Sequence, residues 1–207
     1  MKKKIAIFAS GTGSNARKII EYFQDHPDIS VGLVVSNNPT AGVLDIARDH
    51  HLPAIVINRQ EFREGTQLSD ELKQHHIDFI VLAGFLWLIP AWLVKQYEQR
   101  MVNIHPSLLP KFGGKGMYGM HVHEAVCQAG ERETGITIHY VNEQYDDGNI
   151  VFQTKCIVEP DDTPHTVAKK VQQLEHRYFP EVIEQLMLNN ISQYHLSLPK
   201  NNLFPLL

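Results

Sequence analysis

The sequence predicts an α/β fold, in which a mostly parallel sheet has helices on both faces and antiparallel strands follow near the C-terminal end. Two observations support this prediction. Over the first half of the chain, short apolar runs alternate with helical patterns, as expected for strands buried on both faces of a parallel sheet. Nearer the C-terminus, two apolar runs are joined by a short turn rich in aspartate and glycine, as in an antiparallel pair.

The first half of the chain begins with a continuous apolar run over residues 4–9. A helical pattern follows, with Ile19, Ile20 and Phe23 on one side. Further elements alternate in the same way, namely strands over 31–35, 54–57 and 79–83 and from Met101, and helices over 41–51, within 58–77 and after Pro90. This alternation predicts a parallel sheet.

The second half of the chain predicts a strand hairpin between two helices. In chain order we expect a helix over 121–129, strands over 137–141 and 150–153 joined by residues 145–149, and a closing helix from Thr163 to Leu186. Pro180 lies inside the closing helix and removes a backbone hydrogen bond, so the helix should break or kink there.

Length and composition fit one globular domain. The chain has 207 residues, with 43% hydrophobic and 20% charged residues. Neither an internal repeat nor a low-complexity linker interrupts it, so a single domain is predicted over residues 1–189. Residues 190–207 carry two prolines and no periodicity, and we expect an extended or loosely docked tail.

Composition argues against several classes of function. A net charge of −4 provides no basic patch for nucleic acid or an anionic membrane. Cys127 and Cys156 have no metal-ligand spacing and suggest no disulfide framework, which favours a reducing compartment and no metal. The first apolar run ends at Ala9, too early for a signal peptide, and no other run approaches a membrane span. A cytoplasmic location is therefore expected.

The first strand leads into a glycine-rich turn, Ser10-Gly11-Thr12-Gly13-Ser14-Asn15-Ala16. A strand, a G-x-G-x-x-A turn and a helix occur in this order in a Rossmann-like dinucleotide site. That site needs an acidic residue after the second strand, where this chain has Ser36-Asn37-Asn38-Pro39. Main-chain N–H groups and the helix dipole can still bind an anion, so we interpret the turn as a cradle for a single phosphate. The alternative is a tight turn in which Ser14 or Asn15 only caps the helix.

The stretch Asn103-Ile104-His105-Pro106-Ser107-Leu108-Leu109-Pro110 gives the strongest indication of chemistry. Residues two apart on a strand face the same side, so Asn103 and His105 should point together. Pro106 should end the strand and leave His105 at its carboxyl edge, where ligands bind in α/β sheets. The alternative is a core histidine beside a turn-forming asparagine, but the pair before a proline favours a functional site.

Three other segments carry candidate residues. The junction 84–90 is more apolar than a surface loop, so it either packs against the next helix or lines a pocket for a flat apolar ligand. Four glycines within 111–120 indicate a mobile lid. Asp146 and Asp147 either form a plain turn or bring a carboxylate beside His105.

Together these segments resemble the formyltransferase family that uses 10-formyltetrahydrofolate, and most closely its branch acting on 5'-phosphoribosylglycinamide (GAR). The matching segments are Ser10-Gly11-Thr12-Gly13-Ser14-Asn15, Val35-Ser36-Asn37, Leu82-Ala83-Gly84-Phe85, Asn103 to Pro110, Gly135-Ile136-Thr137-Ile138-His139, Asp146-Asp147-Gly148 and Glu175-His176. The Asn-x-His-Pro-Ser-Leu-Leu-Pro run is specific for the folate formyltransferases as a group. The glycine turn and the chain length indicate the GAR branch.

The resemblance implies transfer of a formyl group from 10-formyltetrahydrofolate, as cosubstrate, to the amine of GAR in de novo purine biosynthesis. It assigns the catalytic roles to Asn103, His105 and Asp146. The residues implied to bind GAR are Gly11, Thr12, Gly13, Ser14 and Asn15 at its phosphate and Glu175 at its ribose.

The resemblance also implies a folate pocket, in which Trp87 replaces an arginine that relatives often have. The residues implied to bind folate are Arg63, Leu86, Trp87, Leu88, Ile89, Asn103, Tyr140 and Val141. No metal, nucleic acid or membrane is implied, and a monomer or weak homodimer is expected.

Formyl transfer gives the catalytic residues definite roles. Attack of the amine on the formyl carbon creates an oxyanion, which Asn103 and a protonated His105 would stabilise. The folate nitrogen leaves only with a proton, which His105 or an ordered water would supply. Asp146 is expected to keep His105 protonated near neutral pH.

Three other functions fit parts of the sequence. One is formyl transfer to another amine, such as an amino sugar or methionyl-tRNA, and another is hydrolysis of formyltetrahydrofolate. Relatives that act on methionyl-tRNA or hydrolyse the donor carry an additional domain that is not seen in this sequence. The third is a non-catalytic phosphate- or nucleotide-binding module, which would leave Asn103, His105 and Asp146 without a role.

Overall fold

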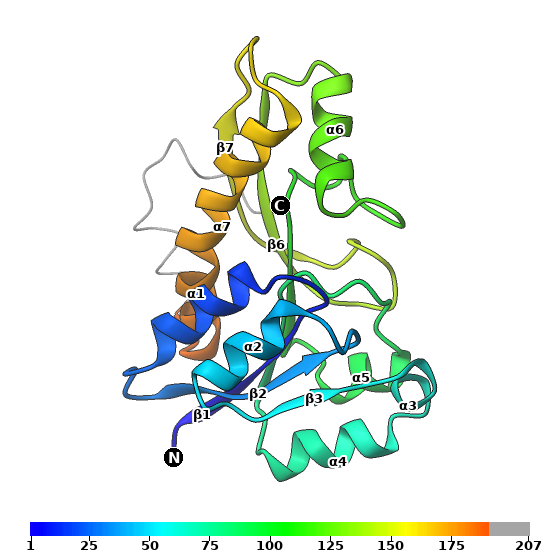
Figure 1. Cartoon of the computed structure of the whole chain (residues 1–207), viewed down its shortest axis with the longest axis vertical. Helices are drawn as coiled ribbons and strands as arrows, with labels where there is room; N and C mark the ends of the chain where they lie inside the picture. Colours follow the sequence, from blue (N-terminus) through cyan, green and yellow to red (C-terminus); the bar gives the residue numbers. More distant parts are fainter. Residues whose placement is uncertain (191–207) are drawn as a thin grey trace. The chain divides into compact units, whose positions relative to one another are not determined.

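The computed structural model of the chain describes residues 1–190 (Figure 1). Within these residues the strands form one seven-stranded sheet in the order β3-β2-β1-β4-β5-β6-β7. The chain divides into two compact units, the first made of residues 1–103 and 141–143 and the second of residues 104–140 and from 144 onward. The predicted α/β class is confirmed, with mostly parallel strands, flanking helices and an antiparallel pair near the C-terminal end. The single domain over 1–189 stays a prediction, and the predicted tail beyond Asn190 lies outside the described residues.

The first unit contains the parallel strands and the helices that connect them. Its elements are β1 (Lys3–Phe8), α1 (Ser14–Phe23), β2 (Ile29–Ser36), α2 (Gly42–Asp49), β3 (Ala54–Val56), α3 (Arg59–Glu64), α4 (Thr66–Gln74), β4 (Phe79–Leu82), α5 (Ala91–Gln96) and the start of β5 (Met101–His105). Strand β1 pairs in parallel with β2 and β4, while β3 pairs with β2 and β5 with β4.

Burial on both faces explains why the first strand is a continuous apolar run. Ile5, Ala6, Ile7 and Phe8 are all fully buried, although successive side chains of a strand point to opposite faces. Ala6 and Phe8 belong to a cluster that includes residues of α3, α4 and α5. Helices α1 and α2 contact β2, and their own apolar stripes are buried. The sheet of this unit is therefore covered on both faces, as expected for parallel strands.

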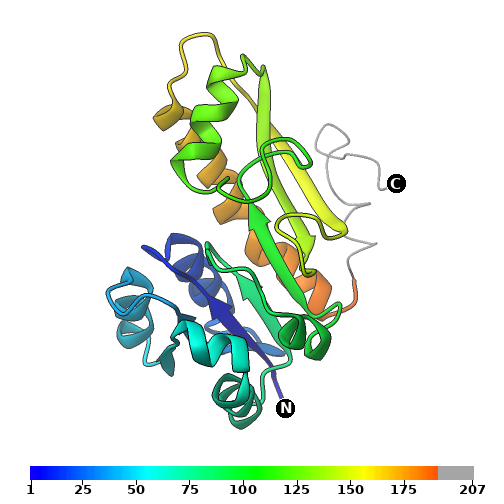
Figure 2. The same ribbon diagram turned by 90° about the vertical axis from the view of Figure 1, so that its right-hand side faces the viewer.

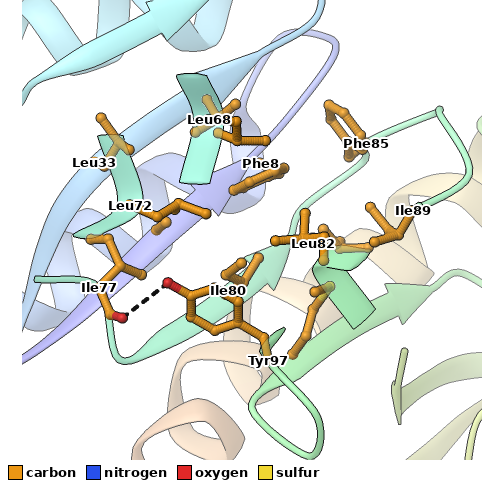
Figure 3. Packing of buried hydrophobic residues seen from close by; sticks show 14 of the residues in the cluster. Phe8, Leu33, Leu68, Leu72, Ile77, Ile80, Leu82, Phe85, Ile89 and Tyr97 are labelled. Carbon is orange, nitrogen blue, oxygen red and sulfur yellow. Dashed lines mark hydrogen bonds between the residues drawn. The ribbon is translucent and has the colours of Figure 1, made fainter. Parts of the chain in front are cut away.

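A cluster of buried hydrophobic residues covers one face of this sheet (Figure 3). Strand residues Phe8, Leu33 and Ile80 meet Leu68 and Leu72 of α4 there. At its edge the hydroxyl of Tyr97 donates a hydrogen bond of 3.1 Å to the carbonyl of Ile77. This bond satisfies a buried polar group that would otherwise destabilise the core.

Gly65 divides the segment 58–77 into two helices, where the sequence predicted a loop and one helix. Its φ of 79° lies in the left-handed region, which favours glycine. A Cβ atom here would come within 2.3 Å of the Trp92 ring. The backbone of α3 and α4 can therefore turn against Trp92 only because residue 65 has no side chain.

The second unit contains the hairpin and its two helices (Figure 2). Its elements are α6 (Met120–Gln128), β6 (Glu133–Tyr140), β7 (Ile150–Ile157) and α7 (Pro164–Met187). Strands β6 and β7 pair antiparallel, and α7 lies along both of them and contacts α6 (Figure 2). The strands extend beyond the predicted apolar runs because the flanking polar residues also pair, for example Thr134 with Cys156.

Helix α7 continues through Pro180, so of the two predicted outcomes the break is wrong, and the kink stays a prediction. Phe179, Pro180, Val182 and Ile183 are all buried. Burial of apolar side chains on both sides of the proline outweighs the loss of one backbone hydrogen bond.

Candidate active site

Strand β5 ends at His105, directly before Pro106, as predicted from the sequence. Asn103 and His105 are two residues apart on this strand, so their side chains leave the same face. His105 is only 3% exposed, whereas Asn103 is partly buried. Both residues therefore stand at the carboxyl end of a parallel strand, where α/β sheets bind ligands.

In the second unit, the carboxylate of Asp146 lies between two buried histidines. Its Oδ2 atom is 3.4 Å from Nδ1 of His105, and its Oδ1 atom is 3.6 Å from Nε2 of His139. Gly114 donates its main-chain N–H to Oδ2 over 2.9 Å. The predicted pairing of His105 with Asp146 is present, and His139 joins it.

Asp146 is held in its charged form by these neighbours. Burial alone would raise the pKa of the carboxyl group. The hydrogen bond from His139, the charge of His105 and the N–H of Gly114 oppose burial, and together they lower the pKa of Asp146 below its ordinary value.

His105 differs from the expectation that Asp146 keeps it protonated near neutral pH. Burial lowers the pKa of His105, and the charge of Asp146 and the Phe112 carbonyl oppose this shift without reversing it. Nε2 of His105 is 2.8 Å from the main-chain oxygen of Phe112. Because a carbonyl can only accept, Nε2 carries the proton of the neutral ring. His105 thus presents an N–H on Nε2, and burial favours its neutral form.

The segment after His105 is tied to the hairpin by side-chain hydrogen bonds. Thr137 Oγ1 donates to the carbonyl of Ser107 over 2.7 Å and accepts from the N–H of Leu109 over 3.0 Å. Gln153 Nε2 donates to the same hydroxyl and to the carbonyl of Leu109. These bonds link the end of β5 to β6 and β7 within the second unit.

Three hydrogen bonds hold the glycine turn of the first unit in place. The N–H of Val43 donates to the carbonyl of Gly11, the amide of Asn38 donates to the carbonyl of Ser10, and the Ser10 hydroxyl accepts from the N–H of Leu86. Gly13 has φ of 79°, and a Cβ atom there would lie 2.9 Å from the backbone of Val43. The turn therefore requires glycine at position 13.

Helix α1 begins at Ser14, with Gly13 as its N-cap and no side-chain capping hydrogen bond. Neither Ser14 nor Asn15 is therefore the N-cap residue, and the phosphate cradle stays a prediction. Its first turn has no acidic residue, so the positive end of the helix dipole is not neutralised locally. Gly11 and Thr12 precede this end of the helix.

The apolar junction after β4 contains both buried and exposed side chains. Leu86 and Leu88 are 45% and 43% exposed, whereas Ile89 is 4% exposed and belongs to the core. Trp87 packs beside Phe62, with ring centroids 5.6 Å apart, and Arg59 lies 5.0 Å above its ring. The junction thus both packs against the core and presents leucine side chains to solvent.

The remaining predicted site residues lie on α3, on α7 and at the end of β6. Arg63 is exposed on α3 and lines a cavity of about 380 Å³ with Arg59, Gln60 and Glu64. Glu175 is partly buried on α7. Tyr140 ends β6 in the second unit, and burial raises the pKa of its hydroxyl. Val141 belongs to the first unit, where its N–H donates to the carbonyl of Met101.

Sequence reasoning gave no role to His139, Phe112 or Gly114. His139 shares one face of β6 with Thr137 and ends a segment that matches the formyltransferase family, and these two signals could have suggested it. Phe112 and Gly114 contact the site through main-chain atoms, so the identity of their side chains does not indicate a role. Within residues 1–190 no group of three or more His, Cys, Asp and Glu side chains could hold a metal ion.

Comparisons with known proteins agree on one family. The model of the family described as formyl transferase matches residues 3–183. The chain is 44% identical over 188 residues to a chloroplastic phosphoribosylglycinamide formyltransferase of Arabidopsis thaliana, covering 88% of this chain and 64% of that relative. It is 36% identical to the phosphoribosylglycinamide formyltransferase of Bacillus subtilis, covering 91% of this chain and 97% of that protein. The crystal structure of the enzyme with that name from Bacillus halodurans superposes with a TM-score of 0.80 at 38% identity, covering 89% and 95% of the two chains.

Proposed function

Because this chain belongs to the formyl transferase family, we propose that it transfers the formyl group of 10-formyltetrahydrofolate to the amine of GAR, in de novo purine biosynthesis. The proposal rests on the carboxylate of Asp146, which lies beside His105. Strand β5, which carries His105, also carries Asn103. The names of the plant and bacterial relatives support GAR as the acceptor. The match over nearly the whole Bacillus subtilis protein supports the same activity for a chain of this size.

In the proposed reaction the amine of GAR attacks the formyl carbon and forms a tetrahedral intermediate with a negative oxygen. We assign the side-chain amide of Asn103 and Nε2–H of His105 as the donors to this oxygen. Such donors stabilise the transition state more than the substrate, and losing one typically lowers turnover on the order of a hundred- to a thousandfold.

The proton balance of this reaction closes within the site. The attacking nitrogen becomes cationic as its bond to carbon forms, and the folate nitrogen needs a proton when its bond to carbon breaks. An ordered water can pass the proton from the attacking nitrogen to the leaving nitrogen, while His105 keeps its Nε2–H on the oxyanion. The negative charge of Asp146 beside Nδ1 favours the protonated form of the ring, which is the stronger donor to the oxyanion.

GAR would bind through its phosphate and its ribose. We assign the phosphate to the main-chain N–H groups of Gly11, Thr12, Gly13, Ser14 and Asn15, because α1 begins there with no acidic residue in its first turn. We assign the ribose hydroxyls to the carboxylate of Glu175.

The folate would bind through its apolar ring system and its anionic tail. The exposed side chains of Leu86 and Leu88 and the half-buried Trp87 suit the ring system. Arg63 beside its cavity suits a carboxylate of the tail. The other assigned folate contacts are Ile89, Asn103, Tyr140 and Val141.

The test is an absorbance assay with 10-formyl-5,8-dideazafolate, with and without GAR. We expect formyl loss that requires GAR and that falls at least tenfold in Asp146→Asn and in Asn103→Ala, because each variant removes one assigned group. Circular dichroism and thermal melting of both variants provide the folding control.

Two results would contradict the proposal. Formyl loss without GAR would indicate a hydrolase, and unchanged rates in both variants would place the chemistry elsewhere. Absence of formyl loss from a folded wild-type chain would point first to another acceptor amine.

We further propose that the chain acts in the cytoplasm as a monomer or weak homodimer, without nucleic acid or membrane partners. The net charge of −4 and the unpaired thiols of Cys127 and Cys156 support this setting. Among the described residues no helix has the length and apolar character to cross a membrane. Size-exclusion chromatography with light scattering tests the assembly state.

A further inference from the structure

Both ring nitrogens of His105 already face an oxygen of the chain itself. Nε2 is 2.8 Å from the carbonyl oxygen of Phe112, and Nδ1 is 3.4 Å from Oδ2 of Asp146. With the ring only 3% exposed, a substrate atom can use His105 only after one of these contacts breaks. The proposed chemistry keeps Asp146 beside Nδ1, so the contact that must break is the one with Phe112.

The Phe112 carbonyl has the same hydrogen-bonding chemistry as the group that the site is proposed to bind. It is an sp² oxygen that accepts one hydrogen bond from Nε2–H of His105. The formyl oxygen of the donor is also an sp² oxygen and becomes a stronger acceptor as it turns into an oxyanion. A main-chain carbonyl thus occupies the position on Nε2 that the formyl oxygen needs.

Phe112 holds this position with an unfavourable backbone conformation. Its φ of 56° lies in the left-handed region, where a residue with a Cβ atom is disfavoured about five- to thirtyfold relative to glycine. The neighbours on both sides are tied down, since the Ser107 hydroxyl donates to the carbonyl of Lys111 over 2.7 Å and Gly114 donates to Asp146. These anchors keep Phe112 in place although its own conformation favours release.

We propose that Phe112 caps His105 in the resting chain, and that the formyl oxygen of the donor replaces the Phe112 carbonyl on Nε2. One hydrogen bond to a carbonyl is exchanged for another, with no covalent change. The left-handed backbone of Phe112 weakens the cap and so favours this exchange. Phe112 is then a positioning residue, which holds the N–H of His105 on Nε2 until the donor arrives. The inference rests on the proposed function. It adds that the Phe112 carbonyl and the formyl oxygen compete for Nε2–H of His105.

The test compares Phe112→Gly with Phe112→Ala, which lack the same aromatic ring and differ by one Cβ atom. Glycine accepts the left-handed region without strain, so it should strengthen the cap relative to alanine. We expect the glycine variant to bind 10-formyl-5,8-dideazafolate at least fivefold more weakly than the alanine variant. Both variants should bind the deformylated 5,8-dideazafolate equally, because that ligand lacks the formyl oxygen that is proposed to compete for Nε2.

Turnover gives a second readout of the same competition. With saturating GAR, kcat/KM for the formyl donor should be about fivefold lower in Phe112→Gly than in Phe112→Ala, while KM for GAR is equal in the two. Phe112→Asn should fall between them, because asparagine tolerates the left-handed region better than alanine does. This third variant also keeps the comparison with glycine available if the alanine variant does not fold.

A matched control uses the same exchange at Met117, which lies in the same loop and is not among the residues with positive φ. Met117→Gly and Met117→Ala should bind the formylated donor equally. Equal affinity of the two Phe112 variants for this ligand would overturn the inference. If Phe112→Gly bound both ligands equally more weakly than Phe112→Ala, the inference would also be overturned, because the effect would not depend on the formyl oxygen. Failure of the wild-type chain to transfer formyl to GAR would instead contradict the proposed function.

Discussion

The side chain of Asp146 is surrounded by polar and ionisable groups of the second unit. It takes a left-handed backbone conformation, with φ of 54°, which aspartate tolerates better than most residues. Its two oxygens face His105 and His139, and Gly114 donates to one of them. The carboxylate therefore stays charged although it is largely buried.

His139 should influence catalysis through Asp146 without contacting the substrate. His139→Leu removes a ring whose Nδ1 contacts the carbonyl of Tyr140 and whose Nε2 faces the buried Asp146 carboxylate, and it should lower the free energy of unfolding by about 1.5–3 kcal/mol. It should also raise the pKa of Asp146, so the acid limb of the kcat/KM pH profile moves to higher pH. His139→Gln retains a donor and should shift the limb less.

Two measurements check this prediction, namely urea denaturation and the pH profile of formyl transfer in both variants. A leucine variant with the wild-type profile would show that His139 only fills space in the core.

At the scale of elements, the β6–β7 hairpin depends on close approaches of backbone to backbone. A Cβ atom at Gly148 would lie 1.6 Å from the carbonyl oxygen of Tyr140, and one at Gly135 would lie 2.0 Å from that of Thr154. Real Cβ atoms do not approach backbone so closely, so each glycine is required by its partner strand. The connection that carries Asp146 is thus fixed by the absence of a side chain at position 148.

Gly148→Ala should therefore disrupt the end of the hairpin. We expect a loss of about 1–3 kcal/mol or more in the free energy of unfolding, because the backbone of β6 must move. Gly11→Ala is the matched control, since neither glycine has a positive φ and nothing lies within 4 Å of a Cβ atom added at Gly11. Chemical denaturation of both variants checks the difference, and equal losses would contradict the assignment to the contact with Tyr140.

At the scale of the whole chain, buried histidines make stability depend on pH. Burial lowers the pKa of His105 and of His123, and Nδ1 of His123 has no hydrogen-bond partner within residues 1–190. Between their lowered pKa values and the ordinary value of 6.5, the unfolded chain binds more protons than the folded chain. The stabilisation is complete above pH 6.5 and is lost as the pH falls.

We therefore expect the free energy of unfolding to fall as the pH drops below 6.5, by up to about 1.4 kcal/mol per pH unit for each of these histidines. Asp146 adds a second loss at lower pH, below its ordinary value of 3.8, because its pKa is lowered in the folded chain. Urea denaturation between pH 5 and 8 measures the first window. His123→Leu should reduce the slope there, and an unchanged slope would contradict the assignment to His123.

Much of this architecture could be predicted from the sequence, because its signals are local. The run 5–9 is apolar since both its faces are buried, and β5 ends before Pro106, where a missing donor and a fixed φ require it. Pro180 did not break α7, because packing on that helix, which the sequence does not display, outweighed the local rule.

The candidate site was predicted less completely, because its charges depend on burial and on distant neighbours. The sequence indicated that Asp146 meets His105, and the structure places them together. It could not indicate that burial would lower the pKa of His105, since the exposed fraction of a side chain is a property of the folded chain. His139 was missed for a similar reason, because only the folding of the hairpin connection brings it to the carboxylate.

The loop after Phe112 has a fixed point at each end, and this affects how its sequence can change in evolution. On one side Gly114 is fixed to Asp146, and on the other α6 begins at Met120. Gly114, Gly116 and Gly119 would each place an added Cβ atom in open space. Residues inserted or deleted between these fixed points need not move His105 or Asp146. Natural selection can therefore change the length and sequence of this short stretch while the catalytic groups stay where they are.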